Sequence, residues 1–257
     1  MALGMGRLEA AARLGFAARG VMYVLIGWLA LRTGRGEDGP GVIDYLGSGA
    51  GRLLVAGMAA GFFGYGAWRL LDAWADASGR GGDAKALVVR AGGGASGLLH
   101  LGLGAVALLH ALGGGGGGGG EAGEQSARAA LGLPGGWIAL LLAAAALLAA
   151  GLHQLGKAWT ADFLRRLAAR AAARGWIEWL GRAGFAARGI VFLIVAWFFW
   201  RAAMAERSNE AGGLGEALAA LPASLRALVA AGLLLFGLFS FVEARYRRIA
   251  TPHLSPR

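Results

Sequence analysis

Six apolar segments, separated by polar stretches, set the pattern of this chain. They cover residues 15–33, 53–74, 91–112, 135–156, 183–204 and 221–242. Each is close to the ~20 residues that an α-helix needs to cross a bilayer, and most have no polar face. Because every backbone polar group in lipid must be paired within its own segment, the pattern predicts an all-α membrane protein with six transmembrane helices.

Two short stretches recur along these segments. The first opens every odd-numbered segment and reads RLGFAARG at residues 13–20, RAGGGASG at residues 90–97 and RAGFAARG at residues 182–189. The second closes every even-numbered segment and reads GAWRLLDA at residues 66–73, GLHQLGKA at residues 151–158 and GLFSFVEA at residues 237–244. Internal repetition indicates an architecture before any single motif does. We expect three helical hairpins, residues 1–78, 79–162 and 181–257, with residues 163–180 as a connector between the last two.

The distribution of basic residues predicts the orientation of the helices. Of the 25 Lys and Arg residues, 15 fall in the N-terminal stretch, the second and fourth connections and the C-terminal stretch, and seven fall in the other connections. Cytoplasmic loops carry the excess of Lys and Arg, so both termini are expected in the cytoplasm. Each hairpin then begins and ends on the cytoplasmic side, and three hairpins of one orientation pack naturally around a pseudo-threefold axis.

Composition agrees with a membrane protein and excludes other classes. Hydrophobic residues make up 57% of the 257 residues and charged residues 16%, and the 48 glycines suit closely packed transmembrane helices. The lack of cysteine excludes disulfides, thiolate catalysis, iron–sulfur clusters and cysteine-ligated zinc. The net charge of +10 is concentrated in alternate connections, which indicates lipid headgroups as the partner and not nucleic acid.

The motif RxGFxARG, complete at residues 13–20 and 182–189, and the ending FGLFSFVEARYRRI at residues 236–249 resemble the bacterial membrane family called domain of unknown function 1206. The resemblance covers essentially the whole chain. It implies six helices in three two-helix repeats and a place in the bacterial cytoplasmic (inner) membrane, and it implies no activity. The middle repeat departs from the pattern, because Gly93 and His100 replace aromatic residues and Ser96 replaces the second arginine.

Two arginines of the motif, Arg19 and Arg188, are expected inside the membrane. Twelve uncharged residues separate Arg19 from Arg32, and twelve separate Arg188 from Arg201. Twelve residues span ~18 Å of helix, which is less than the ~30 Å hydrocarbon core, so each helix must carry an arginine into the bilayer. Such a charge typically faces a partner inside the protein. The alternative is that both side chains extend to the cytoplasmic headgroups.

The aligned ends of the even-numbered segments offer partners for these arginines. Asp72 and Glu243 occupy the same position in the outer repeats, and Lys157 occupies it in the repeat that has Ser96 in place of arginine. Charge balance would produce this distribution, and so would unrelated interfacial charges. We predict a polar ring at the cytoplasmic end of the bundle. Its candidate members are Arg13, Arg19, Asp72, Arg90, Ser96, His100, Lys157, Arg182, Arg188 and Glu243.

The histidines and hydroxyl residues give little support to an enzyme or a metalloprotein. His100 and His153 lie in neighbouring segments at depths ~9 Å apart, and no HxxxH spacing occurs. Hydrogen-bonded core histidines are the simpler interpretation. Ser96, Ser240 and Thr160 have no base at a usable spacing, and no GxSxG motif is present. The sequence therefore predicts no catalytic residue, no metal and no cofactor.

The connector and one outer loop carry patterns of their own. Trp159, Phe163 and Leu167 recur every four residues, and arginines recur at the same interval from Arg166 to Arg174. A basic amphipathic helix of this kind is expected to lie in the cytoplasmic interface against anionic lipid, with a solvated connector as the alternative. Eight consecutive glycines at residues 113–120 predict a flexible outer loop.

Two classes of function remain. In the first, the chain is a structural or regulatory membrane protein that binds a partner, a second copy of itself included, and the polar ring fixes helix register. In the second, it is a carrier or channel for a small solute, and the ring is an inner gate. Broken helices near the midplane would favour transport, and no proline lies in the middle of a segment. An enzyme or electron carrier is the least supported class.

Overall fold

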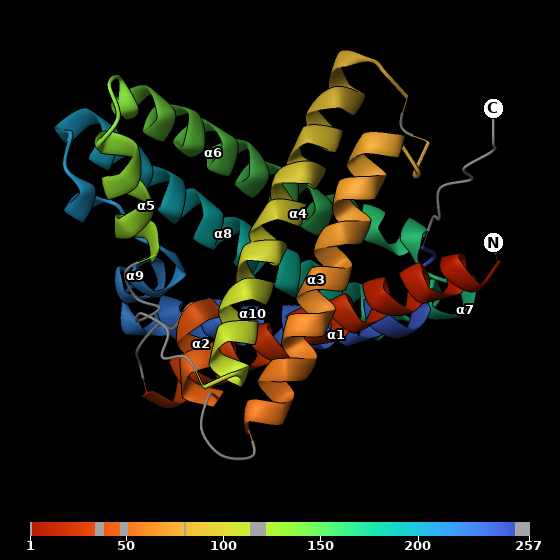
Figure 1. The fold of residues 1–257 in the computed structure, drawn as a ribbon. Coiled ribbons are helices and arrows are strands. Elements are labelled where there is room, and N and C mark those ends of the chain that lie inside the picture. Colours follow the sequence, from red (N-terminus) through yellow and green to blue (C-terminus); the bar gives the residue numbers. More distant parts are fainter. Residues whose placement is uncertain (1, 34–38, 47–50, 80, 114–121, 250–257) are drawn as a thin grey trace. The chain divides into compact units, whose positions relative to one another are not determined.

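The computed structural model describes residues 2–33, 39–46, 51–79, 81–113 and 122–249. Within these ranges the chain is helical and forms no strand. Six helices are long and apolar enough to cross a membrane, which confirms that part of the prediction. They are α1 (Ala2–Thr33), α3 (Gly51–Ala75), α4 (Ala84–Ala111), α6 (Gly136–Thr160), α8 (Gly175–Ala205) and α10 (Ala223–Tyr246) (Figure 1).

Shorter helices connect these spans. They are α2 (Gly39–Leu46), α5 (Ala122–Leu131), η2 (Asp162–Arg166), α7 (Ala169–Ala172), η3 (Ser208–Glu210) and α9 (Leu214–Ala219). The carboxylate of Asp83 accepts a hydrogen bond of 2.8 Å from the backbone N–H of Ala86 and so caps the start of α4. Residues Ala161 and Glu206, with φ of 54° and 51°, end α6 and α8 in the left-handed conformation. The glycine run from 114 to 120 and the stretch from 250 to 257 lie outside the described residues.

The chain divides into two compact units. Unit 1 comprises Met1–Gly20, Tyr45–Gly116 and Ser240–Arg257, and unit 2 comprises Val21–Asp44 and Gly117–Phe239. Helices α1 and α10 therefore each contribute one part to either unit. In unit 1, α3 and α4 pack along their lengths, and in unit 2, α6 and α8 do the same (Figure 1). Both pairs join the second helix of one predicted hairpin to the first helix of the next.

Glycine lets α1 approach α3 in unit 1. A Cβ atom at Gly61 would lie 2.8 Å from the backbone oxygen of Leu14 and 2.9 Å from the Cβ atom of Ala18, which leaves no room for a side chain. Next to this contact the ring of Phe16 meets the ring of Tyr65 edge-on, with centroids 5.1 Å apart. Both rings are buried, and with Ala12 and Trp68 they form the core of this contact.

The corresponding positions of α8 and α10 make a similar contact in unit 2. Gly232 aligns with Gly61, and a Cβ atom there would lie 3.3 Å from the backbone oxygen of Ala183. Phe185 and Phe236 align with Phe16 and Tyr65 in the other unit, and their ring centroids are 5.3 Å apart, again edge-on. The two hairpins that carry the complete motif therefore use the same small and aromatic positions to bring their helices together.

The connector differs from the continuous amphipathic helix that the sequence predicted. Ala161 reverses the chain after α6, and the residues that follow form only the single turns η2 and α7. Phe163 and Leu167 are buried inside the protein, and the ring of Phe163 lies 5.1 Å from that of Phe185. The prediction of one interfacial helix over residues 163–180 is wrong, because Phe163 and Leu167, two of the three regularly spaced apolar residues, are buried in unit 2.

The outer surface of the connector is basic and aromatic. Trp159, Trp176 and Trp179 are all more than half exposed. Four arginines around them are exposed as well: Arg165, Arg166, Arg170 and Arg174. A hydrogen bond from Arg165 lowers the pKa of the exposed Asp162 carboxyl below its ordinary value. Exposed tryptophan beside arginine is typical of residues at the headgroup level of a membrane.

Candidate functional site

The first arginine of each motif donates hydrogen bonds to the end of an even-numbered span. The three sets are Arg90 to the backbone oxygens of Ala73 and Trp74 (2.8 Å each), Arg182 to those of Ala158 and Trp159 (2.9 and 2.6 Å), and Arg13 to those of Ala244 and Arg247 (2.7 and 3.3 Å). In each set one acceptor is the alanine that closes the second recurring stretch. No set crosses from one unit to the other: two sets lie in unit 1 and one lies in unit 2.

This contact has a clear physical cause. The last carbonyl groups of an α-helix have no partner within the helix, and the negative end of the helix dipole attracts a cation. Arg13 and Arg182 are further oriented by acids one turn earlier, since Arg13 pairs with Glu9 at 2.6 Å and Arg182 pairs with Glu178 at 2.8 Å. The donors of these arginines are therefore taken up by the protein itself, which is what a structural role requires.

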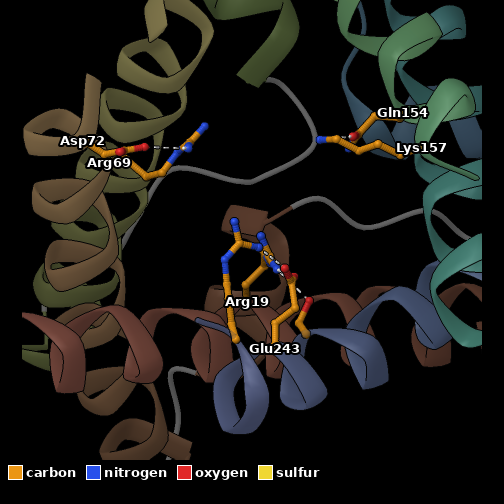
Figure 2. A network of polar contacts seen from close by, with 8 residues as sticks. Arg19, Arg69, Asp72, Gln154, Lys157 and Glu243 are labelled. Atoms are coloured by element: carbon orange, nitrogen blue, oxygen red, sulfur yellow. Dashed lines mark hydrogen bonds and ion pairs between the residues drawn. The ribbon is translucent and has the colours of Figure 1, made fainter. Parts of the chain in front are cut away.

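The second motif arginine of the first repeat, Arg19, is buried in a polar cluster of unit 1. Its guanidinium pairs with the carboxylate of Glu243 and donates a 3.1 Å hydrogen bond to the hydroxyl of Ser240 (Figure 2). Arg247, the residue after the end of α10, pairs with the same carboxylate. Glu243 is 3% exposed, and the ring of Phe16 lies 4.9 Å from the Arg19 guanidinium. A buried carboxylate shared by two arginines satisfies charges that would otherwise be costly in an apolar interior.

The pair α3 and α4 also combines an arginine with a buried acid. Here the arginine lies on the same helix as the acid, and the motif position on the facing helix carries no arginine. The motif position of Arg19 is Ser96 in α4, and the position aligned with Ser240 is Arg69 in α3. Arg69 lies 3.8 Å from Asp72, which aligns with Glu243 (Figure 2). Asp72 is buried and also accepts hydrogen bonds from the backbone N–H and the hydroxyl of Ser78, at 2.9 and 2.6 Å.

Gly93 explains how this exchange is accommodated. It occupies the position that is Phe16 in the first repeat, and a Cβ atom there would lie 3.4 Å from a terminal nitrogen of Arg69. The missing aromatic ring leaves the space that the guanidinium occupies. The departures of the middle motif at Gly93 and Ser96 are thus matched by an arginine on the facing helix.

The pair α6 and α8 carries two cations at these positions and no acid. Lys157 in the last turn of α6 contacts the buried side chain of Gln154, 3.4 Å away (Figure 2). Its ammonium group lies 5.5 Å from the ring centroid of Phe185. Arg188 in α8 lies against three aromatic rings, those of Tyr23, Phe192 and Phe236, at 4.9 to 5.5 Å from their centroids.

Glycines fix the register of two of these helix pairs. A Cβ atom at Gly151 would lie 3.1 Å from the backbone oxygen of Gly189, and the converse distance is also 3.1 Å. Gly66 and Gly97 stand at the aligned positions of α3 and α4, and their corresponding distances are 2.9 and 3.0 Å. Because the contact is reciprocal and nearly identical in both pairs, aligned residues of the two pairs occupy comparable positions.

His100 is accounted for by packing. Its Nδ1 atom lies 2.7 Å from the backbone oxygen of Ser96, one turn earlier in α4, and its ring lies 4.6 Å from that of Tyr65. In the part of the chain that the structure describes, no group of three or more His, Asp or Glu side chains is arranged to hold a metal ion.

Sequence reasoning missed three members of these clusters. Ser240 and Arg69 occupy one aligned position, three residues before Glu243 and Asp72, and comparing that position across the repeats would have indicated them. Arg247 lies one turn after Glu243, in a C-terminal stretch whose basic residues were used only to predict the orientation. No pattern in the sequence shows that this side chain turns back toward the buried carboxylate.

The comparisons with known proteins agree with the repeat pattern. A family described as Domain of Unknown Function (DUF1206) matches residues 14–76 and again residues 183–247. A protein of Bacillus subtilis (strain 168), described as the uncharacterized protein YxxB, is 28% identical over 251 residues, which cover 92% of this chain and 90% of the relative. No solved structure matches the chain. The two family matches begin one residue after Arg13 and Arg182 and include the rest of the two complete motifs, and the altered middle motif falls outside both.

Proposed function

Because the chain belongs to the family described as Domain of Unknown Function (DUF1206), whose description assigns no activity, we propose a function from the geometry: a polytopic membrane protein with a structural or partner-binding role. In this proposal the repeated charges hold the helices together. Two helix pairs pack along their lengths, α3 with α4 in unit 1 and α6 with α8 in unit 2, and the contact of Arg13 with Ala244 joins α1 to α10 in unit 1. Six membrane-length helices support the membrane location.

The observation that carries the proposal is the use of the motif arginines. Arg13, Arg90 and Arg182 each donate to the closing alanine of an even-numbered span. The donor of each pair follows the acceptor by one span, and the first span donates to the last, so the three contacts form a closed cycle in sequence order. A cycle of equivalent contacts is what three hairpins around a pseudo-threefold axis would make.

The same proposal places both termini in the cytoplasm of a bacterial cell. The excess of Lys and Arg in the N-terminal stretch, alternate connections and C-terminal stretch supports this orientation. The connector then lies at the cytoplasmic headgroups. Its exposed tryptophans and arginines suit contact with anionic lipid, although the buried Phe163 and Leu167 do not take part.

The test compares Arg90→Gln and Arg182→Gln with Arg165→Gln in the purified protein. Each motif arginine donates two hydrogen bonds from a charged group, so its loss should cost about 1.5–3 kcal/mol per bond. Arg165 is exposed and pairs with its neighbour Asp162 at the surface, and its loss should cost about 0–1 kcal/mol. Thermal unfolding in detergent measures the difference. Motif variants as stable as Arg165→Gln would contradict the structural role.

Transport of a small solute is the second candidate, favoured by the two cations of the α6 and α8 pair. A structural protein would leave sealed liposomes as impermeable as empty ones. Reconstituted protein that accelerates the flux of phosphate or another small anion, with a loss of that flux in Arg188→Gln, would replace the structural proposal by the transport proposal.

A further inference from the structure

The polar positions between α6 and α8 differ from those of the other two pairs in their net charge. Glu243 and Asp72 supply a carboxylate in unit 1, and Lys157 stands at their aligned position in unit 2. The second motif arginine is nevertheless present in α8, as Arg188. One helix pair therefore places two positive charges where each of the others places an ion pair.

Arg188 has an incomplete set of partners. Its Nε atom is buried and donates to no atom among the described residues. Its guanidinium is surrounded by aromatic rings, which attract a cation without accepting a hydrogen bond in the plane of the guanidinium. A buried donor without an acceptor costs about 1–3 kcal/mol or more when it is charged, so an acceptor that the described residues do not supply is expected here.

The ion pairs described in unit 2 use their carboxylates elsewhere. Four carboxylates pair with other arginines: Glu124 with Arg128, Asp162 with Arg165, Glu178 with Arg182 and Glu210 with Arg201. Arg188 also lies about 9 Å along α8 from Arg182, which is the residue that caps α6. At that depth water is a poor substitute for a counterion.

Each cation lies beside one of two rings that pack edge-on against each other. Lys157 lies 5.5 Å from the centroid of Phe185 and Arg188 lies 5.1 Å from that of Phe236, and the two ring centroids are 5.3 Å apart. The reciprocal contact of Gly151 and Gly189 fixes α6 against α8 at this level. Lys157 and Arg188 are thus carried by two closely packed helices, each beside one ring of this pair.

We propose that this arrangement is a binding site for an oxyanion of the phosphate class. Arg188 is the principal donor, in the place where Glu243 supplies a carboxylate to Arg19. Lys157 supplies a second positive charge, and the rings exclude water around the ligand. A guanidinium offers two parallel N–H groups to a phosphate oxygen pair. The phosphate group comes either from the headgroup of an anionic lipid or from free phosphate in the cytoplasm.

The experiment uses the full-length protein and follows its thermal unfolding. One arm adds inorganic phosphate to protein in a neutral detergent, and the other compares nanodiscs of phosphatidylglycerol with nanodiscs of phosphatidylcholine. A ligand at 100 times its dissociation constant should stabilise the fold by a factor of about 100 in the unfolding equilibrium. Stabilisation in the detergent arm assigns the site to free phosphate, and stabilisation in the nanodisc arm alone assigns it to a lipid headgroup.

Two variants and one control decide whether the effect arises at this site. Arg188→Gln removes the donor. Lys157→Glu places a carboxylate at the position of Glu243, so it should pair with Arg188, keep the protein folded without ligand and abolish the response to phosphate or phosphatidylglycerol. Arg165→Gln removes an exposed connector arginine and should keep the response. The proposal is overturned if phosphate or phosphatidylglycerol stabilises Lys157→Glu as much as the unaltered protein, or if neither source stabilises the unaltered protein. Neither result would contradict the structural role of Arg13, Arg90 and Arg182.

Discussion

Replacing Glu243 with glutamine removes a buried carboxylate that two arginines share. Glu243 is 3% exposed, and the side chains of its partners Arg19 and Arg247 are 8% and 13% exposed. Glutamine keeps the size of the side chain and one acceptor oxygen, so the change isolates the charge. Arg19 would retain its hydrogen bond to Ser240 and lose its counterion.

The expected cost follows from this burial. Removing one partner of a buried ion pair costs about 3–5 kcal/mol, because the remaining charge is left without compensation. At about 2–4 °C per kcal/mol for a chain of this size, the midpoint of thermal unfolding should fall by roughly 6–20 °C. A surface pair gives the matched control. Arg201 and Glu210 pair with side chains 46% and 26% exposed, so Glu210→Gln should cost about 0–1 kcal/mol.

A double change tests the reasoning more strictly. In Arg19→Gln with Glu243→Gln only Arg247 keeps its charge, and Arg247 sits one residue beyond the end of α10, where its side chain is able to turn toward water. The double variant should therefore recover part of the loss seen in Glu243→Gln. Unfolding of all four proteins in one detergent, followed by circular dichroism, supplies the comparison. The reasoning fails if Glu243→Gln is no less stable than Glu210→Gln, or if the double variant is less stable than the sum of its single changes.

Three further predictions concern packing and orientation. Gly151→Ala should destabilise the protein by about 1–3 kcal/mol, because a Cβ atom there would meet Leu193 at 2.8 Å. Gly156 on the same helix has open space around it, so Gly156→Ala should be neutral or stabilising. Equal midpoints of thermal unfolding for the two variants would refute the helix contact. Phe163→Ala should cost about 3–5 kcal/mol of stability, because this ring is buried. Trp176 is 56% exposed, so Trp176→Ala should leave the stability nearly unchanged. The reverse order of stabilities in a denaturation series would favour a lipid-facing helix. Alkaline phosphatase fused after Arg257 should be inactive and a fluorescent protein fused there should be bright, and an active phosphatase would reverse the proposed orientation.

The sequence by itself determined the elements and much of the chemistry. Six apolar runs of membrane length leave the backbone no other solution than helices, because its polar groups must pair within each run. The recurring stretches also indicated which residues would be equivalent, and they singled out Arg19 and Glu243. These are properties of local spacing and of charge in an apolar segment, which a sequence displays directly.

The tertiary structure decided which partners meet. The connector looked like an interfacial helix because an apolar residue recurs every four positions, and that spacing is the same whether the residues face lipid or a protein core. Only packing in unit 2 provides the aromatic rings that bury Phe163. In the same way, Arg188 repeats the motif position of Arg19, but its surroundings are the rings of Tyr23, Phe192 and Phe236. The free energy of a buried charge is set by what surrounds it in space, so identical motifs acquire different partners once the helices pack.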